Sequence, residues 1–286
     1  MRTVKNILGI ILLTGMLLPG FIFKAGAQTK FLVQATTTSI TNEDLARSAG
    51  IMANRIESFT GKKTAFTLLY ESRQVQFVMK GKTDRSIVEK LISHRGILGF
   101  YETYDQNSIA EISKNKVQAV SLFPKSVANG NSARIGCCQI KDREGVERQL
   151  PEEELEHLCR FAWSENFRDG ETCLYALRLL GEGGFILSGR DVEKVNAEGG
   201  SKTHPILINL DFREEAYNTW AEATRRNMDH SIAIVLDGEV ISAPVVKSVI
   251  EGGNCQISGD FSMPEAQYMV ALILNGELPC EFQIVR

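Results

Sequence analysis

The order of apolar patterns in residues 30–104 constrains the fold more than any other feature of this 286-residue chain. Alternating apolar residues predict strands at KFLVQA, TAFTLLY, QVQFVM and ILGFYETY. Helical spacing marks one segment that is capped by Thr41 and ends at Gly61, and a second one, DRSIVEKLISHRG. The resulting order β-α-β-β-α-β predicts a ferredoxin-like unit over residues 28–104 and an α+β fold class.

The first 27 residues have the pattern of an export signal. Arg2 and Lys5 precede an apolar run, and Ala25-Gly26-Ala27 offers small residues for cleavage before Gln28. The run is short for a membrane span and contains glycine and proline, so cleavage is favoured over retention as an anchor. We therefore expect a signal peptide at residues 1–27 and a soluble periplasmic or secreted protein.

Charge argues against a nucleic-acid partner. The whole chain has a formal charge of −3, and the predicted signal segment holds three basic residues and no acidic one, so its removal leaves −6. Proteins that bind nucleic acids usually present an excess of basic residues.

The cysteines are even in number, which suits disulfide bonds in an oxidising compartment. Six cysteines allow 15 connectivities, and the sequence does not choose among them. A zinc site is disfavoured, because no C-x-x-C pair occurs and the four histidines are scattered. We predict no metal, no cofactor and no catalytic residue. The cysteines are Cys137, Cys138, Cys159, Cys173, Cys255 and Cys280.

Residues 105–170 show weaker periodicity and are predicted to be a connector or an insert. Three glutamates, Glu152 to Glu154, follow Pro151 in this segment. Proline followed by acidic residues is typical of a first helical turn, where negative charge meets the positive end of the helix dipole. A helix start therefore explains these glutamates better than a metal site does.

Residues 171–260 predict a second α+β unit, which contains the stretch IAIVLDGEVISAPVV. Its Asp237-Gly238 pair predicts a tight hairpin turn with positive φ angles, and Trp220 is interpreted as a core residue. Residues 261–286 predict a final helix and strand. Ser262 and Glu265 form an S-x-x-E capping box at the start of this helix. Whether this last segment returns to the first unit is left open.

The order of these pieces resembles the large first periplasmic domain of SecD, a protein-export membrane subunit. The resemblance rests on the LDG-x-V-x-SAP hairpin, the GGNCQISGDF segment and the EA…L…G-x-LP helix, and it is most specific over residues 188–279. It implies a base at residues 28–104 and a head at residues 171–260 that contacts emerging polypeptide. Because the sequence stops at Arg286, before the spans that couple proton flow in that family, we expect no proton coupling by this chain alone.

Three classes of function remain. The leading hypothesis is an exported, non-enzymatic binding module that engages unfolded polypeptide or a protein-export membrane component. A structural or surface-interaction protein that reuses the fold is the alternative, and a hydrolase comes third, because no motif pairs a nucleophile with a base. An apolar groove or an exposed sheet edge would favour the first class, and a deep pocket with converging polar groups would favour the hydrolase.

Overall fold

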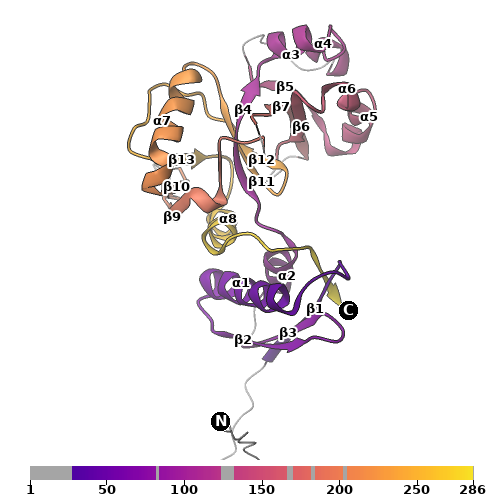
Figure 1. The fold of residues 1–286 in the computed structure, drawn as a ribbon, viewed down its shortest axis with the longest axis vertical. Coiled ribbons are helices and arrows are strands. Elements are labelled where there is room, and N and C mark those ends of the chain that lie inside the picture. Colours follow the sequence, from indigo (N-terminus) through magenta and orange to yellow (C-terminus); the bar gives the residue numbers. More distant parts are fainter. Residues whose placement is uncertain are drawn as a thin grey trace, which may run out of the picture.

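The computed structural model describes residues 28–81, 84–123, 132–165, 170–181, 184–201 and 205–285, so the predicted signal peptide lies outside the described residues. Its helices and antiparallel sheets confirm the α+β class. The molecule is elongated, with a small base at one end and a larger head at the other (Figure 1). Within the described part of the chain, no helix combines the length and the apolarity that a bilayer span needs.

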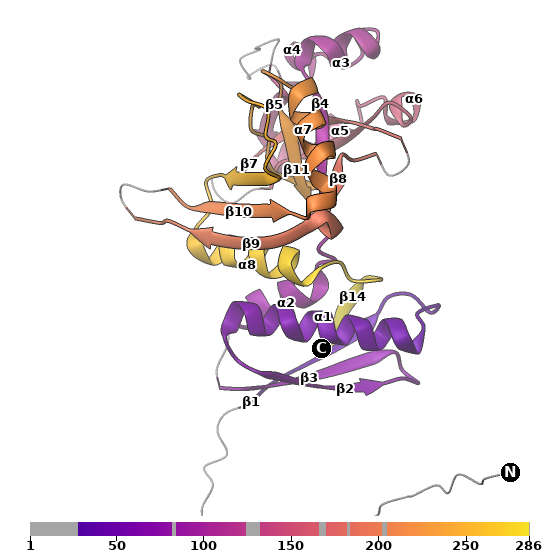
Figure 2. The ribbon, with the colours of Figure 1, turned by 60° about the vertical axis from the view of Figure 1, so that its left-hand side comes forward.

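The base is a four-stranded antiparallel sheet in the order β14-β1-β3-β2, with two helices on one face (Figure 2). Thr41 caps the first helix by accepting the Asp44 N–H, and Gly61 ends it with a φ of 66°. Both boundaries therefore lie where the sequence predicts them. The elements are β1 (Gln28–Ala35), α1 (Asn42–Thr60), β2 (Thr64–Leu69), β3 (Gln74–Lys80), α2 (Arg85–Ser93) and β14 (Phe282–Val285).

The predicted unit over residues 28–104 needs a correction at its last strand. Strand β4 (Leu98–Tyr104) does not join the base sheet but pairs with β11 in the head, and β14 takes the edge position beside β1. The physical reason is burial on both faces: the first five residues of β4 are all buried. Such a strand fits the centre of a larger sheet better than the edge of a small one.

The head contains a three-stranded sheet and a larger sheet around a common apolar core. Trp220 lies in this core in edge contact with Phe100 and Phe212, as its predicted core role requires. The smaller sheet is β9 (Val192–Glu198), β10 (Leu207–Phe212) and β13 (Asn254–Ser258). The other elements here are β7 (Glu171–Arg178), β8 (Leu187–Ser188), α7 (Tyr217–Arg226), β11 (Ile232–Leu236) and β12 (Glu239–Ser242).

The larger sheet bends until its ends meet. Its strands run β12-β11-β4-β7, β5 (Arg134–Gln139) also pairs with β7, and β6 (Cys159–Trp163) pairs with β7 outside this order. At the end of β6, Ser164 forms a parallel bridge with Val240 of β12, and the Glu165 N–H donates to the Val240 carbonyl at 2.9 Å. These contacts close a small barrel around an apolar interior that includes Ala233 and Val235. We call the contact between β6 and β12 the barrel seam.

Residues 105–165 are more than a connector, because most of this segment is folded around a core of its own. That core packs Ile109, Ile135, Trp163 and Leu174 together. The helix predicted after Pro151 is present, with all three glutamates in its first turn. The elements are α3 (Gln106–Ile112), α4 (Ala119–Leu122), β5 (Arg134–Gln139), α5 (Arg143–Glu147), α6 (Glu152–Leu155) and β6 (Cys159–Trp163).

A disulfide bond joins Cys137 on β5 to Cys173 on β7, where the two residues lie directly opposite each other. The sequence left this pairing open because the two residues are 36 positions apart. The bond ties the segment before residue 165 to strand β7 of the head. Among the described residues the other four cysteines are free.

We expect loss of this disulfide to lower the free energy of unfolding by about 2–4 kcal/mol, because the bond restricts the unfolded chain. The variant Cys137→Ala/Cys173→Ala should show this loss in urea unfolding under oxidising conditions. The control is Cys138→Ala, which changes the neighbouring free cysteine. Equal midpoints for the double variant and the wild type would show that the bond does not form or does not matter.

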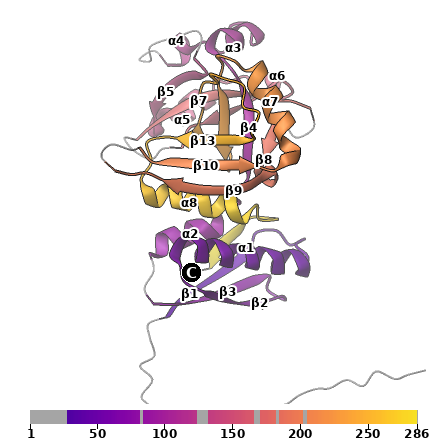
Figure 3. The ribbon, with the colours of Figure 1, turned by 90° about the vertical axis from the view of Figure 1, so that its left-hand side faces the viewer.

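The carboxyl-terminal helix α8 (Met263–Asn275) lies between the base and the head (Figure 3). Its start confirms the predicted capping box, since the Ser262 and Glu265 side chains satisfy each other's backbone N–H groups. One face packs on the head core through Met269 and Leu272. After Gly276 the chain enters the base sheet as β14, so residues 261–286 connect the two units a second time.

Candidate functional site

The hairpin β11–β12 points its turn at the junction of base and head. Asp237 has a φ of 51° and Gly238 a φ of 88°, so the predicted positive-φ turn is confirmed. Aspartate tolerates this conformation better than most residues, and glycine adopts it without steric cost. The turn therefore follows from local sequence, but its position against α2 does not.

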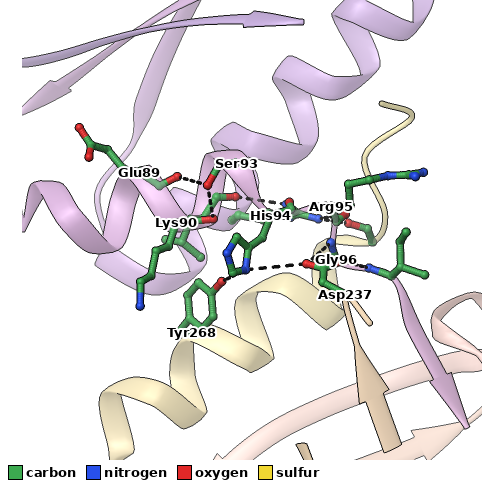
Figure 4. Close-up of polar contacts among 12 residues, drawn as sticks. Glu89, Lys90, Ser93, His94, Arg95, Gly96, Asp237 and Tyr268 are labelled. Atoms are coloured by element: carbon green, nitrogen blue, oxygen red, sulfur yellow. Dashed lines mark hydrogen bonds and ion pairs between the residues drawn. The ribbon is translucent and has the colours of Figure 1, made fainter. Parts of the chain in front are cut away.

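Asp237 also clamps the link between α2 and β4 (Figure 4). Its two carboxylate oxygens accept the N–H groups of Gly96 at 3.0 Å and Ile97 at 2.8 Å, and its own N–H donates to the Ile97 carbonyl at 2.9 Å. Both oxygens are thus occupied by backbone donors, which does not suit a general base. Sequence reasoning missed this clamp, because the partners lie about 140 positions away and carry no local signal.

A second group of polar side chains surrounds His94 at the end of α2. The Tyr268 hydroxyl bonds to His94 Nδ1, and Asp237 Oδ2 lies 3.8 Å from the same nitrogen (Figure 4). Burial lowers the pKa of His94, which outweighs the opposing effect of Asp237. Burial is also the main cause that raises the pKa of Tyr268. His94 is therefore neutral near pH 7, and Tyr268 keeps its proton.

This trio resembles a nucleophile, base and orienting acid only in composition. A catalytic relay uses both ring nitrogens of the histidine, one toward the nucleophile and one toward the acid. Here Tyr268 and Asp237 approach the same nitrogen, and the raised pKa makes Tyr268 a poor nucleophile. The geometry does not support a hydrolase at this place.

Arg55 on α1 contacts the same end of α2 as this group of polar side chains. Its side chain is fully buried and donates to the carbonyls of Leu91, His94 and Arg95, at 3.2, 2.5 and 2.7 Å. It also donates to Gly276 at the end of α8, at 2.5 Å. Burial lowers its pKa to about 10, so it remains charged at neutral pH. Arg55 thus joins the ends of α2 and α8, and we call this contact set the Arg55 joint.

A cleft of about 650 Å³ opens beside the joint, between base and head, and we call it the base–head cleft. Its walls carry charges of both signs, and the part of the chain that the structure describes offers no group of three or more metal-binding side chains. The titratable residues on its walls are Lys90, His94, Arg95, Glu165, Asp237, Glu239, Tyr268 and Glu281.

The head carries a smaller, apolar hollow of about 200 Å³, which we call the head groove. Small-molecule sites usually measure roughly 300–1,000 Å³, so this groove suits a side chain better than a drug-sized ligand. Val245 at its rim is 47% exposed. The groove residues are Trp220, Thr224, Ile232, Ile234, Pro244, Val245, Val246, Lys247, Ser248, Ile250, Cys255 and Gln256.

An open strand edge borders the head groove. Strand β13 pairs with β10 on one side, and the bond from the Phe212 N–H to the Gly253 carbonyl sets which residues face β10. Bonding alternates along antiparallel strands, so Asn254, Gln256 and Ser258 turn their backbone groups to the other side. Side chains occupy the carbonyls of Asn254 and Ser258. In the described chain, neither backbone group of Gln256 has a backbone partner.

Fold and site define a two-part α+β module with a buried joint and an apolar groove beside an open strand edge. Residues 172–280 match the family model for the SecDF P1 head subdomain. The predicted resemblance to the first periplasmic domain of SecD is therefore confirmed.

Several curated proteins that this chain resembles are SecD subunits of the protein translocase. Protein translocase subunit SecD of Acidaminococcus fermentans is 36% identical over 116 residues, which cover 41% of this chain and 27% of the relative. The subunit of Petrotoga mobilis is 40% identical over 102 residues, 36% of this chain and 22% of the relative. The subunit of Dictyoglomus turgidum is 28% identical over 175 residues, which cover 61% of this chain and 39% of the relative. The chain thus matches less than half the length of each of these relatives.

Solved structures support the fold over most of the chain. A structure titled "Structure and function of a membrane component SecDF that enhances protein export" has a TM-score of 0.56 and 22% identity, covering 90% of this chain and 98% of that one. A crystal structure of SecDF in a super-membrane-facing form has a TM-score of 0.59 at 22% identity, covering 90% of this chain and 29% of that one. At this identity the likeness concerns the fold.

Proposed function

We propose that this chain is a non-enzymatic binding module of protein export, which holds an extended segment of unfolded polypeptide in the head groove. The observation that carries the proposal is the apolar groove directly beside Gln256, whose backbone groups have no backbone partner among the described residues. An added strand gains main-chain hydrogen bonds from such an edge, and alternate side chains enter the pockets next to it.

The chemistry of the groove favours an unfolded chain over a folded one. Folded proteins bury most apolar side chains and pair their backbone groups, whereas an unfolded segment offers both at once. The head groove needs both features. An apolar side chain of the ligand would fill the hollow, and a backbone N–H and C=O of the ligand would bond to Gln256. The module therefore binds by general features of polypeptide and not by one sequence.

The similar proteins suggest in which process this binding takes place. Their names and titles place SecD and SecDF in a protein translocase and in a membrane component that enhances protein export. By analogy, the proposed partners are unfolded exported polypeptides and membrane components of the export machinery, and the proposed location is the periplasm or beyond. A pull-down from an export-competent cell envelope tests these partners.

Replacing Val245 by aspartate should weaken binding of an unfolded polypeptide at least tenfold, because a charge would enter the rim of the groove. The fold should survive, since Val245 is 47% exposed. The matched control is Ile140→Asp, at a residue that is 51% exposed and not part of the groove. Binding of a fluorescently labelled, reduced and alkylated polypeptide can be measured by anisotropy. Equal affinities for the two variants would contradict the assignment of the groove.

Gln256→Pro tests the strand edge separately. Proline removes one backbone N–H, and proline is tolerated on edge strands where that N–H faces outward. We expect Gln256→Pro to fold and to lose most of its affinity for the labelled polypeptide. Ile257→Pro should instead lower stability, because the Ile257 N–H faces β10. Full binding by a folded Gln256→Pro protein would exclude strand addition at β13.

A further inference from the structure

Two carboxyl groups meet where the barrel seam faces the base–head cleft. Ser164 and Val240 form the bridge across the seam. Glu165 directly follows Ser164 in the sequence, and Glu239 directly precedes Val240. Both side chains line the base–head cleft. A side-chain hydrogen bond links Glu165 to Glu239, and two carboxylates in such contact repel each other unless a proton lies between them.

The surroundings favour a shared proton. Burial, together with a hydrogen bond and the charge from Glu239, raises the pKa of Glu165 to about 8, against a smaller opposing effect of Lys90 on α2. Glu265 at the start of α8 adds to the rise. Arg143 of α5 lies 3.6 Å from Glu239, which favours placing the negative charge on Glu239 and the proton on Glu165.

Three other titratable groups of the cleft have partners of their own. Asp237 bonds to the link between α2 and β4, Arg95 pairs with Glu277, and His94 bonds to Tyr268. Glu281 also lines the cleft, on the segment that enters β14. Lys90 is a cation of the base whose charge acts on Glu165.

We propose that the Glu165–Glu239 pair is a proton-dependent latch, in which one shared proton holds β12 against β6 and its loss opens the barrel seam toward the cleft. Repulsion then acts on the β11–β12 hairpin, whose turn carries Asp237. Because Asp237 clamps the link between base and head, an open seam also loosens that clamp. The latch is a property of the fold and does not depend on polypeptide binding.

The sign of the pH effect follows from the direction of the shift. An unfolded glutamate releases its proton near pH 4.5, whereas folded Glu165 keeps it up to about pH 8. The folded state therefore binds more protons in this range, so the contribution of the pair to stability is complete in acid and is lost as the pH rises toward 8. A carboxylate that pairs with a cation ordinarily has the opposite effect, because its folded pKa is lowered.

Amide hydrogen exchange at the seam tests the latch. In the wild type, the Glu165 N–H donates across the seam. After correction for the intrinsic pH dependence of exchange, this amide should exchange up to about 100-fold faster at pH 9 than at pH 6, because the deprotonated fraction of Glu165 rises from about 1% to about 90% between these two pH values. Glu165→Gln should abolish this difference, because an amide can donate to Glu239 at every pH.

Two further variants keep the test decisive. Glu239→Gln removes the repulsion from the other side and should also abolish the difference, which covers the case that Glu165→Gln does not fold. Glu153→Gln changes an exposed glutamate of α6 and should keep it. The proposal is wrong if the seam amide of the wild type shows no excess exchange at pH 9, or if Glu165→Gln and Glu239→Gln show the same excess as the wild type.

Discussion

Arg55→Leu should lower the free energy of unfolding by about 3–5 kcal/mol, because it leaves four carbonyl acceptors without their charged donor. Leucine fills much of the space but donates no hydrogen bond. The carbonyls of Leu91, His94, Arg95 and Gly276 would then lie in a buried joint without the guanidinium. Urea unfolding at pH 7 measures the loss.

The matched control is Arg47→Leu on the same helix. Arg47 is 62% exposed and forms a surface ion pair with Asp44 one turn away, so this variant should stay within about 0.5 kcal/mol of the wild type. If the two variants unfolded at the same urea concentration, the Arg55 joint would not hold base and head together.

Asp237→Asn should cost about 1.5–3 kcal/mol, because it removes one of two hydrogen bonds to a charged acceptor. The turn alone predicts a nearly neutral change, since asparagine suits positive φ as well as aspartate does. The structure adds two hydrogen bonds that this expectation leaves out. An asparagine has one acceptor oxygen, so its NH₂ group would face the N–H of either Gly96 or Ile97.

Asp229→Asn separates the clamp from the turn. Asp229 also has a positive φ, of 62°, but its side chain is 75% exposed and forms a surface ion pair with Lys247. Asparagine at position 229 should therefore leave the thermal midpoint nearly unchanged. A stable Asp237→Asn protein would show that the two hydrogen bonds contribute little, and the turn would then be the whole role of Asp237.

Features that depend on neighbouring residues could be predicted from the sequence. The caps at Thr41 and at Ser262, and the turn at Asp237-Gly238, follow from side chains that satisfy backbone groups within a few residues. The order of strands and helices in the base was predictable for the same reason. Local patterns, however, do not say which sheet a strand joins.

The remaining features depend on contacts between distant parts of the chain. The apolar run of β4 fits either sheet, and the pairing of β14 with β1 decides the matter from the other end of the sequence. The four acceptors of Arg55 are carbonyls, which every residue has, so no residue type marks them. The edge at Gln256 likewise becomes visible only from the register of β13 on β10.

The central claim is that unfolded polypeptide adds a strand beside β13, and amide exchange of Gln256 tests it most directly. The Gln256 N–H faces the open edge, whereas those of Cys255 and Ile257 face β10. With saturating reduced and alkylated polypeptide, exchange at Gln256 should slow by about tenfold or more while its two neighbours, already protected, change little. Bound polypeptide with unchanged exchange at Gln256 would contradict the account.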